Sequence, residues 1–173
     1  MLPAQSLILG GAASGKSLFA EGLVKQSGRP MIYLATAQAF DDEMRAKLEK
    51  HKDQRGAGWR TIEEPMDVGR TLAALGGDTA ILLDCVTMWL SNQILAEADL
   101  GEAEASLMAG LALCAAPVVM VSNEVGSSVV PDNALARRFR DAQGQLNQKL
   151  AARADLVVNV VAGLPQVLKG ELP

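Results

Sequence analysis

The sequence is poor in several residue types, and each shortage excludes a class of protein. Aromatic residues make up 3% of the 173 residues, so the stacking platforms that bind single-stranded nucleic acid are scarce. The formal net charge is −4, which leaves no basic excess to grip a nucleic-acid backbone. No apolar run reaches the length that spans a bilayer. We therefore expect no nucleic-acid partner and no membrane insertion.

Cysteine and histidine are rare as well. The two cysteines, Cys85 and Cys114, lack metal-ligand spacing and are too few for a disulfide framework, which favours a reducing compartment. The first residues carry no basic region and become rich in glycine too early for a signal peptide. These features predict a cytoplasmic location. The only histidine is His51.

Hydrophobic residues, by contrast, make up 49% of the chain, which is enough to build one sizeable core. We predict a single nucleotide-binding catalytic domain over residues 1–173. Unbroken apolar runs predict buried strands, and periodic segments predict helices. The predicted strands are 6–9, 31–36, 59–64, 79–85, 117–126 and 155–164, the last two running into loops, and the predicted helices are 17–26, 41–55, 66–75, 86–97, 101–114 and 132–153. This alternation indicates an α/β fold, a mostly parallel sheet with helices on both faces.

A glycine-rich segment, "GGAASGKS", follows the first predicted strand and opens the first predicted helix. It matches the phosphate-binding P-loop pattern in the context that the pattern requires. Its backbone amides are expected to bind phosphate oxygens, Lys16 to neutralise β- and γ-phosphate charge, and the Ser17 hydroxyl to bind Mg²⁺. The residues of the segment are Gly10, Gly11, Ala12, Ala13, Ser14, Gly15, Lys16 and Ser17. The alternative is a glycine-rich turn that matches the pattern by chance.

Polar residues end other predicted strands, at the edge where ligands bind in parallel sheets. Asp84 ends a buried strand as a Mg²⁺-binding carboxylate would, and its alternative role is that of an N-cap for the next helix. Asn123 and Glu124 end the following strand, where they either bind ligand or make turn hydrogen bonds. Three arginines early in the last helix fit a solvated face best. They are Arg137, Arg138 and Arg140.

His51 lies on the second predicted helix, among Lys50, Lys52, Asp53 and Arg55. Helical spacing places it where an apolar stripe becomes polar, so we expect it at a rim rather than in the core. A neutral imidazole beside cations is able to attack phosphorus and hold a phosphoramidate. The alternative is an ordinary surface histidine.

Several longer segments make the sequence similar to a known family. They are "YLATAQAFDDEM", "HKDQRGAGWRTIEEP", "ILLDCVTMWLSN", "VSNEVGSSVVPDNALARRFRDAQGQLNQKLA" and "GLPQVLKG", together with the P-loop. Over nearly its whole length the chain resembles the bifunctional adenosylcobinamide kinase / adenosylcobinamide-phosphate guanylyltransferase family of cobalamin biosynthesis. One departure is Ala13, where the family loop usually has arginine.

The resemblance implies two reactions on a corrinoid substrate. In the first, ATP or GTP phosphorylates the aminopropanol hydroxyl of adenosylcobinamide; in the second, GMP passes from GTP to that phosphate, with His51 carrying GMP covalently. The family's nucleotide contacts fall, besides the P-loop, on Ala35, Thr36, Ala37, Lys52, Asp53, Gln54, Arg55, Glu63 and Asp84. The resemblance also implies a RecA-like P-loop NTPase fold and a homo-oligomer, either a trimer or a pair of trimers.

Two other functions are compatible with the P-loop. One is a monofunctional small-molecule kinase in which His51 is structural. The other is a RecA-like regulatory or assembly ATPase that binds a macromolecule, and the low aromatic content and acidic charge argue against a nucleic acid as that partner.

Overall fold

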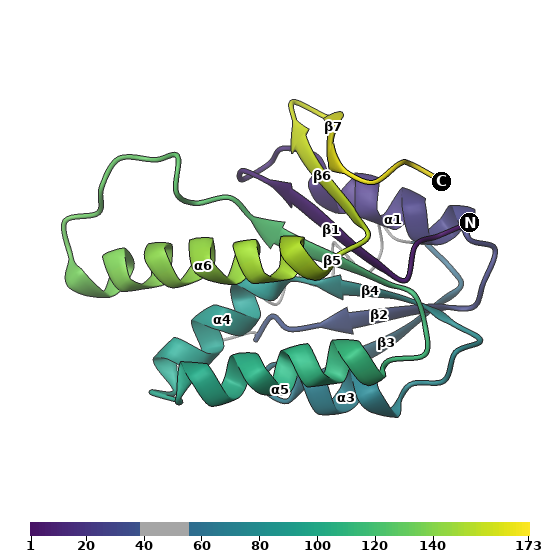
Figure 1. Cartoon of the computed structure of the whole chain (residues 1–173), viewed down its shortest axis with the longest axis horizontal. Helices are drawn as coiled ribbons and strands as arrows, with labels where there is room; N and C mark the ends of the chain where they lie inside the picture. Colours follow the sequence, from purple (N-terminus) through teal and green to yellow (C-terminus); the bar gives the residue numbers. More distant parts are fainter. Residues whose placement is uncertain (39–55) are drawn as a thin grey trace.

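A seven-stranded sheet forms the centre of the molecule, with helices packed against it (Figure 1). The computed structural model describes residues 1–38 and 56–173. The strands are β1 (Gln5–Gly10), β2 (Met31–Ala35), β3 (Trp59–Glu63), β4 (Ala80–Asp84), β5 (Val118–Asn123), β6 (Leu156–Val161) and β7 (Leu164–Lys169). The helices are α1 (Lys16–Gln26), α3 (Val68–Ala74), α4 (Val86–Leu95), α5 (Leu100–Leu113) and α6 (Ala134–Arg153).

The strand order across the sheet is β3-β2-β4-β5-β1-β6-β7. Every pairing is parallel except the last, in which β7 runs antiparallel to β6. The parallel strands therefore all end at one edge of the sheet, on the left in Figure 1. In open parallel sheets this carboxyl edge is where ligands bind.

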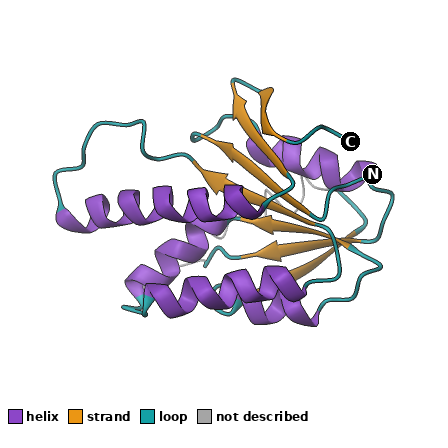
Figure 2. Cartoon of the chain, in the orientation of Figure 1, coloured by secondary structure: helices purple, strands orange, loops and turns teal. Residues whose placement is uncertain are grey.

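Helices lie on both faces of the sheet (Figure 2), and the central strands are buried on both sides. Successive residues of a strand point to opposite faces of the sheet. Leu7, for example, belongs to the core formed with α3, α4, α5 and α6, whereas Ile8 belongs to the core formed with α1. Both cores are built from aliphatic side chains that the unbroken apolar strand sequences supply. The predicted α/β fold with helices on both faces is therefore confirmed.

Two glycines allow α3 and α5 to pack at very short distance. A Cβ added to Gly69 would lie 2.2 Å from the Ser106 carbonyl oxygen, and one added to Gly110 would lie 2.1 Å from the Gly69 carbonyl oxygen. Real Cβ atoms do not approach backbone this closely, so no other residue fits either position without moving a helix. This contact fixes α5 against the sheet face that α3 covers.

The predicted elements agree with the structure except at the C-terminus and at some ends. The segment 155–164, expected to be one strand and a loop, contains β6 and leads into β7, a strand that the prediction missed. Pro165 lies within β7 and all six β7 residues are exposed, so the segment has no buried pattern to reveal it. The long helix begins two residues later than predicted, because the Asn133 side chain caps it by accepting from the Ala136 amide at 2.7 Å. The predicted helix 41–55 lies outside the described residues.

Gly110→Ala is expected to lower the free energy of unfolding by about 2 kcal/mol, because the new methyl group must push α3 and α5 apart. Urea unfolding followed by circular dichroism measures this change. Gly144→Ala is the matched control: a Cβ there meets nothing within 4 Å, so the helix preference for alanine should stabilise α6 by up to about 1 kcal/mol. Equal stabilities for the two variants would contradict the close helix contact.

Candidate functional site

Residues from four neighbouring strands meet at the carboxyl edge of the sheet. Glu63 is paired with Ala35, Ala35 with Asp84, and Asp84 with Val121, so these residues form one row across β3, β2, β4 and β5. Two residues farther along β5, Asn123 is paired with the last residue of β1, where the glycine-rich loop begins. The register therefore brings the predicted site residues of four strands to one edge.

The glycine-rich loop of residues 10–15 connects β1 to α1 and needs glycine at two points. A Cβ at Gly10 would lie 2.4 Å from the Ser14 Oγ and 2.7 Å from the Val160 carbonyl oxygen. Gly15 has φ 92°, a left-handed conformation that side chains disfavour. Ala13 also has positive φ, 54°, within the left-handed region that non-glycine residues adopt only occasionally. The loop is therefore a tight turn set by close backbone packing.

Lys16 folds back over this loop. Its side chain is largely buried, with 9% of the residue exposed, and its Nζ donates to the Gly11 carbonyl oxygen at 3.1 Å. A single neutral acceptor leaves two of the three ammonium protons for an anion. The position is thus suited to neutralise the charge of a phosphate held in the loop.

The start of α1 offers backbone donors to an anion. No side chain caps this terminus, and its first turn holds no acidic residue. Within the described part of the chain, the amides of Gly15, Lys16 and Ser17 have no protein acceptor. Three unpaired amides at the positive end of a helix, next to a lysine ammonium, are an arrangement suited to a phosphate group.

Asp84 ends β4 and is oriented by an aromatic side chain from β2. The Tyr33 hydroxyl donates to its Oδ2 at 2.9 Å, and the Tyr33 ring packs edge-on against Trp59 at a centroid distance of 6.1 Å. The alternative role of Asp84 as a helix N-cap is wrong, because the N-cap of α4 is Cys85, whose Sγ accepts from the Met88 amide. The Asp84 carboxylate is thus presented at the edge of the sheet.

The thiol of Cys85 is kept protonated by its surroundings. Burial, and then the adjacent Asp84 carboxylate, raise its pKa to about 11, although the Lys16 ammonium acts in the opposite direction. A thiol with this pKa is neutral at physiological pH and is a weak nucleophile. Cys85 therefore fits a structural role better than a catalytic one.

Thr36 ties the ends of β2 and β4 together. It is fully buried, its hydroxyl donates to the Cys85 carbonyl oxygen at 2.7 Å, and the same hydroxyl accepts from the Cys85 amide at 2.9 Å. Its own carbonyl oxygen accepts from the Asn92 side chain at 2.8 Å. Among the other residues predicted to contact a nucleotide, Ala35 is buried, Ala37 is half-buried, and Glu63 is exposed at the end of β3.

Asn123 and Glu124 make structural hydrogen bonds. The Asn123 amide donates to the Thr87 hydroxyl at 2.8 Å, and the Glu124 amide donates to the Gly10 carbonyl oxygen at 3.1 Å. The Glu124 carboxylate accepts from the Gly126 amide at 2.7 Å, which is the turn hydrogen bond given as an alternative above. These contacts join the end of β5 to the start of the loop.

Of the three arginines early in α6, Arg137 and Arg138 are exposed, as expected for a solvated face, whereas Arg140 is half-buried. Arg137 donates to the carbonyl oxygens of Pro131 and Asp132, which closes the turn before the helix. Arg140 lies 3.7 Å from the carboxylate of its neighbour Asp141. None of these contacts reaches the glycine-rich loop.

Five of the predicted site residues lie outside the described residues. They are His51, Lys52, Asp53, Gln54 and Arg55. For these, the predictions from the sequence stay predictions.

The two predicted metal ligands, Ser17 and Asp84, have the right donor chemistry for Mg²⁺. Mg²⁺ takes oxygen ligands and is typically held by one or two protein groups together with substrate phosphates. Ser17 supplies a half-buried hydroxyl in the first turn of α1, and Asp84 supplies a carboxylate at the end of β4, a strand against which α1 packs. The donor set therefore fits.

Two features of the site escaped the sequence analysis. Tyr33 lies in an apolar strand, and only the strand pairing shows that its hydroxyl meets Asp84. The turn between β6 and β7 lies against the glycine-rich loop, where the Gly163 amide donates to the Ser14 carbonyl oxygen at 2.8 Å. The Ala-Gly pair between two apolar runs was the available signal for this turn.

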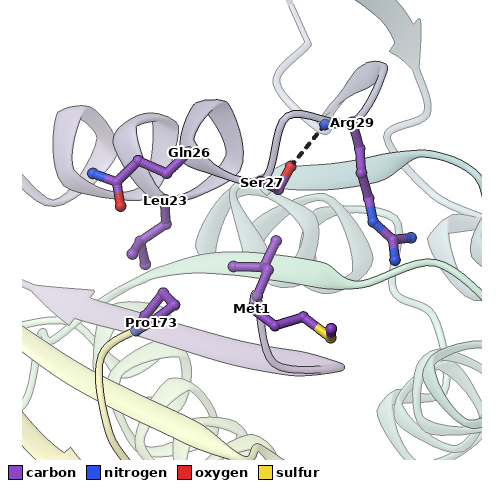
Figure 3. Close-up of a pocket in the computed structure, with 7 residues that line it drawn as sticks. Met1, Leu23, Gln26, Ser27, Arg29 and Pro173 are labelled. Carbon is purple, nitrogen blue, oxygen red and sulfur yellow. Dashed lines mark hydrogen bonds between the residues drawn. The ribbon is translucent and has the colours of Figure 1, made fainter.

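A cavity at the far end of α1 does not belong to this site. It has a volume of about 260 Å³ and is lined by residues that include Leu23, Ser27 and Arg29 (Figure 3). Because α1 has 11 residues, the cavity lies roughly 16 Å along the helix axis from the loop.

No helix in the described segments is both long and apolar enough to cross a bilayer.

The fold is shared with proteins of distant sequence. The flagellar accessory protein FlaH of Methanocaldococcus jannaschii superposes with a TM-score of 0.53 at 13% identity, over 98% of this chain and 80% of that one. An ATPase of a bacterial type III secretion system superposes with a TM-score of 0.56 at 13% identity, over 91% and 52% of the two chains. The P-loop NTPase fold of RecA-like type is therefore confirmed.

Sequence comparison is more specific. The chain is 44% identical to the bifunctional adenosylcobalamin biosynthesis protein CobP of Pseudomonas aeruginosa, over 96% of this chain and 98% of that protein. It is 41% identical to the corresponding protein CobU of Salmonella typhimurium, over 94% and 98%. Residues 6–168 match the family described as cobinamide kinase / cobinamide phosphate guanyltransferase. This chain belongs to that family.

Proposed function

We propose that the protein phosphorylates adenosylcobinamide with ATP or GTP and then converts the product to adenosylcobinamide-GDP with a second nucleotide, GTP. Membership of the kinase and guanyltransferase family supports both activities. The observation that carries the proposal is the phosphate loop, in which three amides without a protein acceptor and the Lys16 ammonium converge. The corrinoid and the nucleotides are the partners that this function requires.

In the first reaction the aminopropanol oxygen attacks the γ-phosphorus, the bond from that phosphorus to the β–γ bridging oxygen breaks, and the hydroxyl proton is released. Lys16 and the loop amides hold the β- and γ-phosphates and stabilise the charge that moves onto the leaving group. Ser17 and Asp84 would hold Mg²⁺, which would neutralise part of the same charge. No protein nucleophile takes part in this reaction.

In the second reaction an imidazole nitrogen of His51 attacks the α-phosphorus of GTP, and pyrophosphate leaves. The phosphate of the corrinoid then attacks the same phosphorus, the P–N bond breaks, and a diphosphate forms. Support for His51 comes from its place in "HKDQRGAGWRTIEEP", which resembles the family pattern, and from its being the only histidine of the chain. The neutral thiol of Cys85 is a poor competitor for this role.

We assign nucleotide contacts to the edge that the strand register defines and to the last residues of the second predicted helix. The proposed contacts are Gly10 to Ser17, Ala35, Thr36, Ala37, Lys52, Asp53, Gln54, Arg55, Glu63 and Asp84. The hydroxyl and the carbonyl oxygen of Thr36 are already hydrogen-bonded within the protein. We therefore propose that Thr36 acts by fixing the position of the backbone turn beside the nucleotide. We further propose one catalytic domain over residues 1–173, a cytoplasmic location and a trimer or a pair of trimers, the last by resemblance alone.

Lys16→Ala should reduce both reactions on the order of a thousandfold, since both require the triphosphate to be held with its charge neutralised. Initial rates of corrinoid phosphate and pyrophosphate formation measure the two activities. Lys25→Ala is the control on the same helix, because its ion pair with Glu21 is surface-exposed and distant from the loop. A Lys16→Ala enzyme with wild-type kinase turnover would remove the loop from the mechanism.

Asp84→Asn should raise the Mg²⁺ concentration needed for half-maximal kinase activity by about tenfold or more, because an amide is a weaker ligand than a carboxylate. The fold should persist, since the asparagine oxygen still accepts from the Tyr33 hydroxyl. Tyr33→Phe keeps the carboxylate and removes only the orienting bond, so its effect should be smaller. An unchanged Mg²⁺ requirement in Asp84→Asn would refute the assignment.

His51→Ala should lose guanylyl transfer and keep the kinase reaction within a few-fold. Wild-type protein incubated with α-³²P-GTP and Mg²⁺ should retain label through denaturing electrophoresis, and γ-³²P-GTP should leave none. A P–N bond predicts release of the label by acid and survival in alkali. Label that persists in His51→Ala would place the intermediate on another residue, and absence of any label in the wild type would favour a monofunctional kinase.

A further inference from the structure

The C-terminal segment "GLPQVLKG" contributes to the family resemblance, yet the proposed function gives it no role. It spans β7 together with the glycine at each of its ends. Gly163 and Gly170 both have left-handed backbone conformations, with φ 78° and 74°. All six residues of β7 are exposed, so burial of side chains does not explain how the strand is held.

Hydrogen bonds at its two ends attach β7 to the rest of the protein. At its C-terminal end the Lys169 Nζ donates to the carbonyl oxygens of Ala151 and Ala152 at the end of α6. At its N-terminal end the Gly163 amide donates to the Ser14 carbonyl oxygen at 2.8 Å. The first contact involves a helix end, whereas the second involves the phosphate loop.

The hairpin of β6 and β7 packs closely against the phosphate loop. A Cβ at Gly15 would lie 3.1 Å from the Gly163 Cα, and a Cβ at Gly10 would lie 2.7 Å from the Val160 carbonyl oxygen in β6. Inside the loop the hydrogen bonds are longer: Ser14 amide to Gly11 oxygen is 3.3 Å and Lys16 Nζ to Gly11 oxygen is 3.1 Å. The bond from Gly163 is thus shorter than either of these two.

This bond fixes the direction of a phosphate-binding amide. The peptide between Ser14 and Gly15 is planar and trans, so its N–H points opposite to its carbonyl group. Because the carbonyl oxygen of Ser14 is directed at the hairpin, the Gly15 amide is directed away from it. That amide has no acceptor in the part of the chain that the structure describes, and Gly15 is the N-cap of α1, immediately before Lys16.

The backbone geometry of the hairpin holds the Gly163 amide in this position. Val161 and Leu164 are paired, which leaves the two-residue turn of Ala162 and Gly163, both with positive φ. Such two-residue turns match the twist of a hairpin and are rigid. β6 itself is paired with β1, the strand that leads into the loop, so the turn and the loop are carried by neighbouring strands.

We propose that the turn between β6 and β7 positions the phosphate loop, with the Gly163 amide as the positioning group for triphosphate binding in both reactions. The inference rests on the proposed function insofar as it requires a nucleoside triphosphate in the loop. Gly163 touches no reacting atom. Its effect passes through the Ser14–Gly15 peptide, so it acts on the affinity for the phosphates rather than on recognition of the base.

The test compares substitutions at the two ends of β7. Gly163→Val places a β-branched residue at φ 78°, so the turn must rearrange and withdraw its amide from Ser14. Gly163→Asn is the matched control, because asparagine tolerates positive φ and a Cβ there meets nothing within 4 Å. Gly170→Ala controls for hairpin stability, since its Cβ would lie 2.2 Å from the Asp155 carbonyl oxygen, away from the loop.

Dissociation constants for GTP and for inorganic triphosphate, both with Mg²⁺, are measured by calorimetry on the full-length protein, and thermal unfolding is measured in parallel. Gly163→Val should weaken both ligands by about tenfold or more and in equal proportion, as expected when a small displacement affects a positioned group. Gly163→Asn and Gly170→Ala should bind as the wild type does, although Gly170→Ala should unfold at a lower temperature.

If Gly163→Val fails to fold, replacement of the Gly163 amide by an ester, with glycolic acid at that position, removes only the N–H and should weaken both ligands several-fold. Wild-type affinity in Gly163→Val, or in the ester variant, overturns the inference, as does an equal loss in Gly170→Ala, which would mean that affinity follows hairpin stability. Loss of GTP binding with triphosphate binding unchanged also overturns it. Failure of the wild type to bind either ligand overturns the proposed function itself, and this inference with it.

Discussion

The site depends on a backbone turn whose amides are left without protein partners so that a ligand can take them. Such a turn has little stabilisation from within, because each internal hydrogen bond, such as that of the Ser14 amide to the Gly11 oxygen, uses a donor that is then lost to the phosphates. Three further hydrogen bonds hold it: the Lys16 ammonium donates to the Gly11 oxygen, the Glu124 amide to the Gly10 oxygen and the Gly163 amide to the Ser14 oxygen. All three contacts use carbonyl groups of the loop, and the amides of Gly15, Lys16 and Ser17 stay available.

The acidic side of the site is held by a separate network. Thr36 and Asn92 satisfy buried polar groups at the ends of β2 and β4, which fixes the backbone on either side of Asp84. Burial and the Asp84 carboxylate raise the pKa of the Cys85 thiol, so the thiol adds no negative charge beside the carboxylate. The Asp84 carboxylate and the Lys16 ammonium thus lie at the same edge of the sheet, with β5 between β4, which ends in Asp84, and β1, which leads into the loop before Lys16.

One phosphate loop is suited to two reactions because the leaving groups have a phosphate in common. Attack at the γ-phosphorus leaves a nucleoside diphosphate, and attack at the α-phosphorus leaves pyrophosphate; the β-phosphate belongs to both. Donors that stabilise charge on the β-phosphate therefore assist both reactions, and the nucleophile decides which bond breaks. In the proposed mechanism the alcohol of the corrinoid is one nucleophile and His51 is the other.

The sequence by itself determined the α/β class, six of the seven described strands, the phosphate loop and the family, because unbroken apolar runs and a short motif in its strand–turn–helix context are local signals. The assignment of Asp84 to the edge of the sheet was local as well, but the N-cap role of Cys85 was not, since cysteine is not among the residues preferred at that position. Tertiary structure alone decided that β5 separates β1 from β4, that Tyr33 meets Asp84 and that the turn before an exposed C-terminal strand lies against the phosphate loop. These are contacts between segments up to about 150 residues apart, and their partners are backbone groups or a tyrosine in an apolar strand, which leave no periodic pattern in the sequence.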